Sequence, residues 1–169
     1  MHRNHGMTLV ELVLVLSILA TILAFAVPAM SHWIENYRVE TLRKQLIFSL
    51  NHARNQAVTH AKSVTVCPGD GMLCTDSWSG QLLVFIDENS NGIRENPDTL
   101  LSTSPLQPPP GKLAWRSFRG TDYLQFEASG MTPALNGTLT FCHDNRAIEG
   151  FALAVARTGR VRIRPPSCS

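Results

Sequence analysis

The sequence Gly6-Met7-Thr8-Leu9-Val10-Glu11 opens an apolar segment that continues to Val27, with Glu11 as its one charged residue. A helix needs about 20 apolar residues to cross the hydrocarbon core of a bilayer. A carboxylate in that core costs about 2.5–3.5 kcal/mol, whereas each apolar residue contributes only a few tenths of a kcal/mol. The segment is long enough to insert despite this cost, so we predict a transmembrane helix over residues 7–28 whose single charge has a purpose.

The amino terminus resembles precursors of the type IV pilin and pseudopilin superfamily, which carry a Gly, a hydrophobic residue and then a Glu at the fifth mature position. Gly6, Met7 and Glu11 match that pattern, and Pro28 matches a helix-kinking proline of many members. The resemblance implies that a prepilin peptidase removes residues 1–6 by cutting after Gly6 and methylates Met7. It also implies that Glu11 pairs with a neighbour's amino terminus during assembly. An ordinary signal anchor or secretory signal peptide is the alternative.

Residues 29–60 are predicted to continue this helix as an amphipathic segment. Apolar side chains recur there every three or four residues, with charged residues on the opposite positions. The apolar positions are Ile34, Tyr37, Leu42, Leu46, Leu50, Ala53 and Ala57. We therefore expect this half of the helix to pack under a folded domain.

From residue 61 to residue 169 the sequence changes to short β-branched and aromatic runs separated by Gly, Pro, Asn and Asp. The segment from Pro105 to Gly111 is too rich in proline for a central strand and is predicted to cross between two parts of the sheet. The predicted fold is α+β and pilin-like, with the long helix packed on a mostly antiparallel β-rich domain. Predicted strands cover residues 63–67, 81–87, 100–103, 112–118, 123–126, 138–143, 151–156 and 161–164.

Four cysteines, Cys67, Cys74, Cys142 and Cys168, all lie outside the apolar segment. An even number of cysteines is typical of a domain in an oxidising compartment such as the periplasm. Three pairings are possible, of which we favour Cys67 with Cys74 and Cys142 with Cys168. The alternative, a zinc site, lacks two closely spaced Cys pairs.

The junction between helix and first strand narrows the resemblance to the GspH/FimT group of minor pilins and pseudopilins. It reads Leu50, then Ala53-Arg54, then Ala57-Val58, then Val64-Thr65-Val66-Cys67. The resemblance implies a single-pass inner-membrane protein with a periplasmic carboxyl-terminal domain, incorporated into a surface pilus. Its implied partners are other pilins, the prepilin peptidase and the inner-membrane assembly platform.

The segment Arg157-Thr158-Gly159-Arg160-Val161-Arg162-Ile163-Arg164 carries four guanidinium groups. In an extended chain Arg160, Arg162 and Arg164 project to one side and form a comb suited to phosphate. Gly159, Arg160 and Arg162 also resemble the Gly-Arg-x-Arg motif of the FimT branch, which is tied to DNA uptake in natural transformation. The resemblance implies non-specific binding of double-stranded DNA. The alternative is a basic edge strand that keeps the domain soluble or contacts an acidic neighbour.

The net charge of +2 is far below that of dedicated DNA-binding proteins, so the hypothesis depends on local clustering. Arg116 and Arg119, interleaved with Trp115 and Phe118, extend the basic patch if the fold brings them near. In such a strand the aromatic side chains are more often part of the core.

Asp87, Asn89, Asn91, Gly92 and Asp98 occupy positions 1, 3, 5, 6 and 12 of a calcium loop of the EF-hand type. The last position, however, is Asp rather than Glu, and the run follows a strand instead of a helix. A hairpin turn rich in Asx residues explains it without a metal. Structural calcium is therefore an open alternative, and we expect no other cofactor.

The sequence does not favour an enzyme. His52 and His60 are wrongly spaced for one helical metal face, and Gly69 and Gly71 lack the continuation of a phosphate-binding loop. We expect a DNA-binding minor pilin, with a purely structural minor pilin or a type II secretion pseudopilin as the alternative.

Overall fold

A computed structural model describes residues 8–132 and 136–168 of the chain. The chain divides into two compact units, Met1–Tyr37 and Arg38–Ser169. A single helix, α1 (Leu9–His60), contributes to both units. Among the described residues it is the one helix long and apolar enough to cross a membrane. The large apolar side chains of its first two turns, Leu9, Val10, Leu12 and Val13 among them, are exposed.

In the second unit, α1 packs through one stripe of side chains, as its periodicity predicts. The buried stripe begins at Val39, which the predicted set omitted, whereas Ile34 and Tyr37 are exposed in the first unit. The stripe then follows the predicted positions: Leu42, Leu46, Leu50, Ala53 and Ala57. Helix α1 ends at His60, as expected, and Ala61 follows it in a left-handed conformation with φ of 52°.

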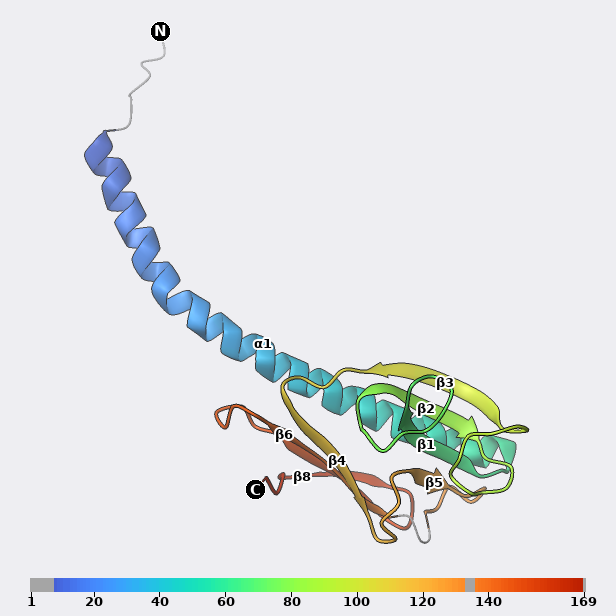
Figure 1. Ribbon diagram of the computed structural model, residues 1–169. Helices are drawn as coiled ribbons and strands as arrows, with labels where there is room; N and C mark the ends of the chain where they lie inside the picture. Colours follow the sequence, from blue (N-terminus) through green and yellow to red (C-terminus); the bar gives the residue numbers. More distant parts are fainter. Residues whose placement is uncertain (1–7, 133–135, 169) are drawn as a thin grey trace. The chain divides into compact units, whose positions relative to one another are not determined.

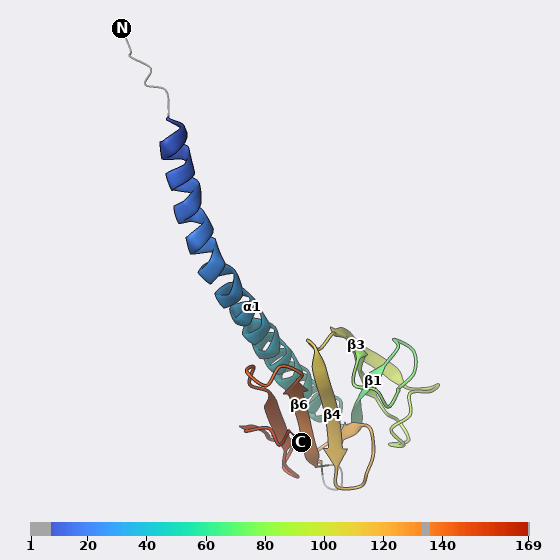
Figure 2. The same ribbon diagram turned by 60° about the vertical axis from the view of Figure 1, so that its left-hand side comes forward.

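All eight predicted strands form, but they make two antiparallel sheets instead of one (Figures 1 and 2). The first sheet has the order β3-β2-β1-β5 and the second the order β4-β6-β7-β8. The strands are β1 (Val64–Gly69), β2 (Gly80–Ile86), β3 (Thr99–Leu106), β4 (Gly111–Ser117), β5 (Leu124–Phe126), β6 (Gly137–His143), β7 (Phe151–Val155) and β8 (Val161–Arg164).

The proline-rich crossover is shorter than predicted. Pro105 belongs to β3, where it pairs with Gln81 of β2. Because β3 is an edge strand, a residue without an N–H donor does not interrupt the sheet. Residues 107–110 make the crossover, and they join two separate sheets.

Both sheets pack on the helical stripe and share one hydrophobic core. The core combines α1 side chains with Val64 and Val66 of β1 and with Leu139 and Phe141 of β6, among others. A smaller cluster, around Leu83 and Phe85, lies on the opposite face of the first sheet. The first sheet is therefore covered on both faces, which explains the continuous burial of β1.

Two disulfides join Cys67 to Cys74 and Cys142 to Cys168, the favoured pairing. Inside the first loop, the backbone N–H groups of Leu73 and Met72 donate to the Asp70 carboxylate and hold its pKa below the ordinary value. The second disulfide ties the tail after β8 to β6. Since β7 lies between these strands, the tail crosses over β7.

Candidate nucleic-acid interface

The arginine segment lies on a hairpin formed by β7, β8 and the turn 156–160, here called the arginine hairpin. Within the turn, Ala156 N donates to Arg160 O at 3.0 Å, and Gly159 N donates to Ala156 O at 2.8 Å. Gly159 has φ of 72°, a left-handed conformation that glycine adopts without strain. The basic segment is thus an ordered hairpin in this structure.

Arg157, Arg160, Arg162 and Arg164 are all exposed. Arg162 and Arg164 pair with Ala154 and Ala152 of β7, so they lie on the face opposite to the buried Leu153 and Val155. We call this the outer face of the second sheet. The predicted comb therefore comes from two arginines of β8, preceded by Arg160 in the turn.

The strand register places a second basic side chain on the outer face. One row across the four strands reads Arg116, Thr138, Ala154 and Arg162. The next row consists of Ala114, Thr140, Ala152 and Arg164, so small side chains lie in the middle of this row as well. The basic edges of β4 and β8 are three strand spacings apart, about 14 Å.

Phe118 continues the outer face at the turn end of the sheet. Its backbone N–H donates to Asn136 O at 3.0 Å, which extends the pairing of β4 with β6 by one residue. Its side chain is 83% exposed. Trp115, by contrast, is buried in the core, which is the more common position for an aromatic side chain in such a strand. The fold therefore brings Arg116 and Phe118 onto the face that carries Arg162, while Arg119 lies in the loop beyond β4.

The turn of the arginine hairpin is held in place by contacts with residues 130–132. Thr132 is fully buried, and it donates from N to Arg157 O at 2.8 Å and from Oγ1 to Ala156 O at 2.9 Å. Arg54 of α1 donates from Nε to Gly130 O at 3.0 Å. That same carbonyl would lie 2.0 Å from a Cβ on Gly159. Sequence reasoning missed this cluster because no local pattern links Arg54 to residues about 76 and 105 positions later.

The four arginines are free of acidic partners among the described residues. Ion pairs there include those of Glu40 with Arg43 and Lys44, and of Lys62 with Glu88. None of these pairs involves the arginine hairpin. Its guanidinium groups are therefore available to an external anion.

The Asp87 loop is held by hydrogen bonds to the carboxylates of Asp87 and Asp98. The Asp87 carboxylate, 1% exposed, accepts from Thr65 Oγ1 at 2.7 Å and Gln125 Nε2 at 2.9 Å. It also accepts from the backbone N–H groups of Gly92 and Asn91. The carboxylate of Asp98, for its part, accepts from the backbone of Glu88 and Glu95. Among the described residues no cluster of three His, Cys, Asp or Glu side chains is placed to hold a metal. The hydrogen-bonded Asx turn is the geometry observed.

The amino-terminal pattern has a local role that the sequence reasoning missed. Thr8 precedes α1, and its Oγ1 accepts the backbone N–H of Glu11 at 3.3 Å. Thr8 and Glu11 thus occupy the positions of a capping box, and the spacing Thr-x-x-Glu signals it. A carboxylate in the first turn also favours the helix dipole. The proposed cleavage site, Gly6 and Met7, lies outside the described residues.

A membrane-length amino-terminal helix and a two-sheet domain stapled by disulfides are the features of a pilin-like protein. Residues 1–27 match the prokaryotic N-terminal methylation motif, and residues 44–165 match the family described as type II transport protein GspH. The chain belongs to this GspH family. No curated protein has a matching sequence.

Two solved structures of the type IV minor pilin FimU from Pseudomonas aeruginosa PAO1 are similar to this chain. The crystal form in space group P21 has a TM-score of 0.59 at 19% identity, covering 79% of this chain and 92% of that chain. The form in space group P65 has a TM-score of 0.55 at 19% identity, covering 75% and 92%. These likenesses establish the shared pilin fold.

Family and fold together make the chain a type IV minor pilin or pseudopilin, and this family and fold are those of structural pilins. Membership implies association with other pilins and with the membrane assembly machinery. The predicted GspH/FimT relationship is confirmed at the level of this family, and so is the predicted pilin-like α+β fold.

Proposed function

We propose that this chain is a minor pilin of a type IV pilus that binds extracellular double-stranded DNA for uptake in natural transformation. The observation that carries the proposal is the arginine hairpin, whose Arg157, Arg160, Arg162 and Arg164 are exposed and have no acidic partner within residues 8–132 and 136–168. Guanidinium groups bind phosphate through paired hydrogen bonds and stay charged at any cellular pH.

The outer face supports the same ligand. Its two basic edges are about 14 Å apart, comparable with the major groove of B-DNA, which is about 12 Å wide. The small side chains between them, including Thr138 and Ala154, leave room for a phosphate backbone to approach. The proposed contacts are guanidinium groups on phosphates, which carry no sequence information, so binding is expected to be sequence-independent.

The proposal includes processing and orientation of the precursor. A peptidase would cut after Gly6, and Met7 would become the methylated amino terminus, with residues 7–28 spanning the inner membrane. The match to the methylation motif supports the cut. Two disulfides support a periplasmic domain, because that compartment is oxidising.

The DNA proposal is tested by binding of the full-length chain, in detergent micelles, to duplex DNA over a salt series. If Arg160, Arg162 and Arg164 each neutralise one phosphate, affinity should fall about 40-fold between about 50 and 200 mM salt. Arg160→Ala/Arg162→Ala should lower the slope of log affinity against log salt by about 1.8.

A matched control removes the same charge elsewhere. Arg146, in the turn after β6, lies at the opposite end of the second sheet, and Lys44 lies on α1. Arg146→Ala/Lys44→Ala should leave the salt slope unchanged. An equal loss in both double variants would show net charge alone to be responsible, and absence of binding by the unmodified chain at low salt would refute the proposal.

A purely structural subunit, including a secretion pseudopilin, is the second candidate, favoured by the match to the type II transport family. Both candidates require assembly, for which we propose that Glu11 pairs with a neighbour's amino terminus. They differ in the arginines: only the DNA-binding pilin should lose transformation and keep its filaments when Arg160 and Arg162 are neutralised.

Glu11→Gln separates assembly from helix capping. Glutamine preserves the capping box, because it serves at the same position as glutamate, but it removes the charge. We expect incorporation into filaments to fall about 10- to 100-fold, corresponding to one charge-assisted hydrogen bond, while membrane insertion is retained. Quantitative immunoblotting of sheared filaments and membranes measures both. Normal incorporation of the Gln variant would contradict the pairing role and leave Glu11 with capping alone.

A further inference from the structure

Strand β4 has a free edge, and the strand register shows which of its backbone N–H and C=O groups point outward from that edge. It lies at the end of the second sheet and pairs only with β6 among the described strands. Phe118 N donates to Asn136 O, and Asp144 N donates to Pro110 O, on either side of the ladder. Hydrogen-bonded pairs alternate in antiparallel sheets, so the even-numbered residues of β4 bond to β6. The N–H and C=O groups of Leu113 and Trp115 therefore point away from β6.

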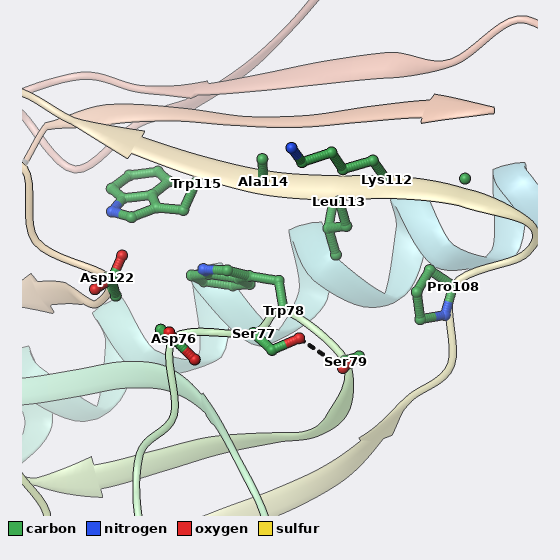
Figure 3. A pocket seen from close by; sticks show the side chains of 11 residues that line it. Asp76, Ser77, Trp78, Ser79, Pro108, Lys112, Leu113, Ala114, Trp115 and Asp122 are labelled. Carbon is green, nitrogen blue, oxygen red and sulfur yellow. Dashed lines mark hydrogen bonds between the residues drawn. The ribbon is translucent and has the colours of Figure 1, made fainter. Parts of the chain in front are cut away.

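A pocket of about 340 Å³ lies along this free edge. Its walls are residues 111–115 of β4 and residues 76–79, the segment that precedes β2 (Figure 3). Side chains alternate along a strand, so five consecutive residues line one pocket only if the backbone edge forms the wall. We call this pocket the β4 slot. It runs along about 13 Å of strand.

Two buried donors face the β4 slot without partners. Trp78 is 5% exposed and Trp115 is 8% exposed, with ring centroids 6.2 Å apart. Neither indole Nε1 has a hydrogen-bond partner among the described residues. The nitrogen-bearing edges of both rings lie on the side of Asp122 (Figure 3). An indole N–H only donates, so the missing partner is a hydrogen-bond acceptor.

The charged residues around the β4 slot indicate which kind of hydrogen-bond acceptor can bind to the two indole N–H groups. Asp76 and Asp122 are exposed and line it, whereas Lys112 points to the other side of β4 from Trp78 (Figure 3). An anionic ligand such as phosphate would meet two carboxylates and is disfavoured. A peptide supplies carbonyl acceptors for the indoles, complements the free edge of β4 and can carry a cation for the carboxylates.

From these observations we propose that the β4 slot receives an extended segment of a neighbouring pilin, which adds to the free edge of β4 and carries a Lys or Arg beside Asp76 and Asp122. Addition of a strand to an exposed sheet edge is an established mode of peptide recognition. Backbone hydrogen bonds to Leu113 and Trp115 set its register, and the two indoles bind its carbonyl groups. This contact is separate from the arginine hairpin and does not depend on DNA binding.

The first test uses indole ¹⁵N-labelled full-length chain in detergent micelles. Trp33→Phe, in the first unit, leaves the two reporter indoles, Trp78 and Trp115. The probe is the peptide acetyl-Val-Thr-Lys-Thr-Val-amide. Both indole signals should shift and saturate with a Kd of about 0.1–1 mM. Amide exchange should slow at Leu113 and Trp115 and stay unchanged at Lys112 and Ala114, whose N–H groups already bond to β6.

Matched probes and variants make the result decisive. The same peptide with N-methylated backbone amides should not bind, because it cannot pair with β4. Asp76→Asn/Asp122→Asn should weaken the Lys peptide about 5- to 10-fold, as expected when a charge-assisted contact is lost, and should not weaken a peptide with Gln in place of Lys. Three outcomes would overturn the proposal. The first is that the indole signals do not shift at about 10 mM peptide, and the second is that the N-methylated peptide binds equally well. The third is that the indole signals shift with a sugar, tested as a methyl glycoside, and not with the peptide.

The source of the segment is tested in assembled filaments. A photo-crosslinking amino acid at the exposed Ser77, in the wall of the β4 slot, should join this chain to a Lys- or Arg-containing segment of another pilin. Mass spectrometry of purified filaments identifies the adduct. Adducts confined to this chain's own residues, or to a protein that is not a pilin, would overturn the assignment.

Discussion

Asp87→Ala is expected to lower the free energy of unfolding by about 3–5 kcal/mol, the cost of leaving several buried hydrogen-bond donors without this acceptor. The Asp87 carboxylate is 1% exposed and connects β1, β5 and its own loop. Its removal leaves Thr65 Oγ1 and Gly92 N without their acceptor, and it leaves Gln125 Nε2 with Thr65 Oγ1 alone. Each of these hydrogen bonds to a charged group contributes about 1.5–3 kcal/mol, and the contributions are not additive. Urea denaturation of the full-length chain in detergent measures the loss.

Asp98→Ala is the matched control for this prediction. Asp98 belongs to the same loop and accepts from two backbone N–H groups, but it is only half-buried. Its loss is expected to cost about 1–2 kcal/mol, because water can replace an acceptor near the surface. Calcium should not shift the unfolding midpoint of the unmodified chain. A midpoint raised by calcium and reversed by a chelator would contradict the hydrogen-bonded loop and restore the metal alternative.

Gly159→Ala is expected to destabilise the domain by about 2–5 kcal/mol and to weaken DNA binding although every arginine is retained. A left-handed conformation costs a residue with a Cβ about 1–2 kcal/mol, and overpacking adds about 1–3 kcal/mol. The new Cβ would lie 2.0 Å from Gly130 O, so the turn must move away from Arg54 and Thr132. Thermal unfolding and DNA titration of the same preparation measure both effects.

Gly120→Ala isolates the packing contribution. Gly120 has the same φ of 72°, but a Cβ there would meet nothing within 4 Å. This variant should therefore lose only the conformational part, about 1–2 kcal/mol. Equal losses at the two positions would show that the contact of Gly159 with Gly130 contributes nothing. The pair of variants thus tests whether the glycine of the Gly-Arg-x-Arg segment serves packing while the arginines face the solvent.

The placement of Arg116 and Arg162 on one face of the second sheet shows why part of the candidate site could not be predicted from the sequence. Side chains alternate along a strand, and this local pattern was enough to predict that Arg162 and Arg164 lie on one side. Whether Arg116 shares their face depends on the order β4-β6-β7-β8, which places two strands between them. The β4 slot likewise depends on which strand of each sheet is left at an edge. Neither arrangement has a signature within a short window of residues.

The sequence by itself determined the elements whose causes are local. The apolar run after Glu11 specifies the membrane-length helix, the spacing from Leu42 to Ala57 its buried stripe, and the β-branched runs the eight strands. Only the tertiary structure decided the division into two sheets, the burial of Asp87 and the close approach of Gly159 to Gly130. These features depend on contacts between residues far apart in the chain, and the free energy of such contacts comes from packing and desolvation in the completed core.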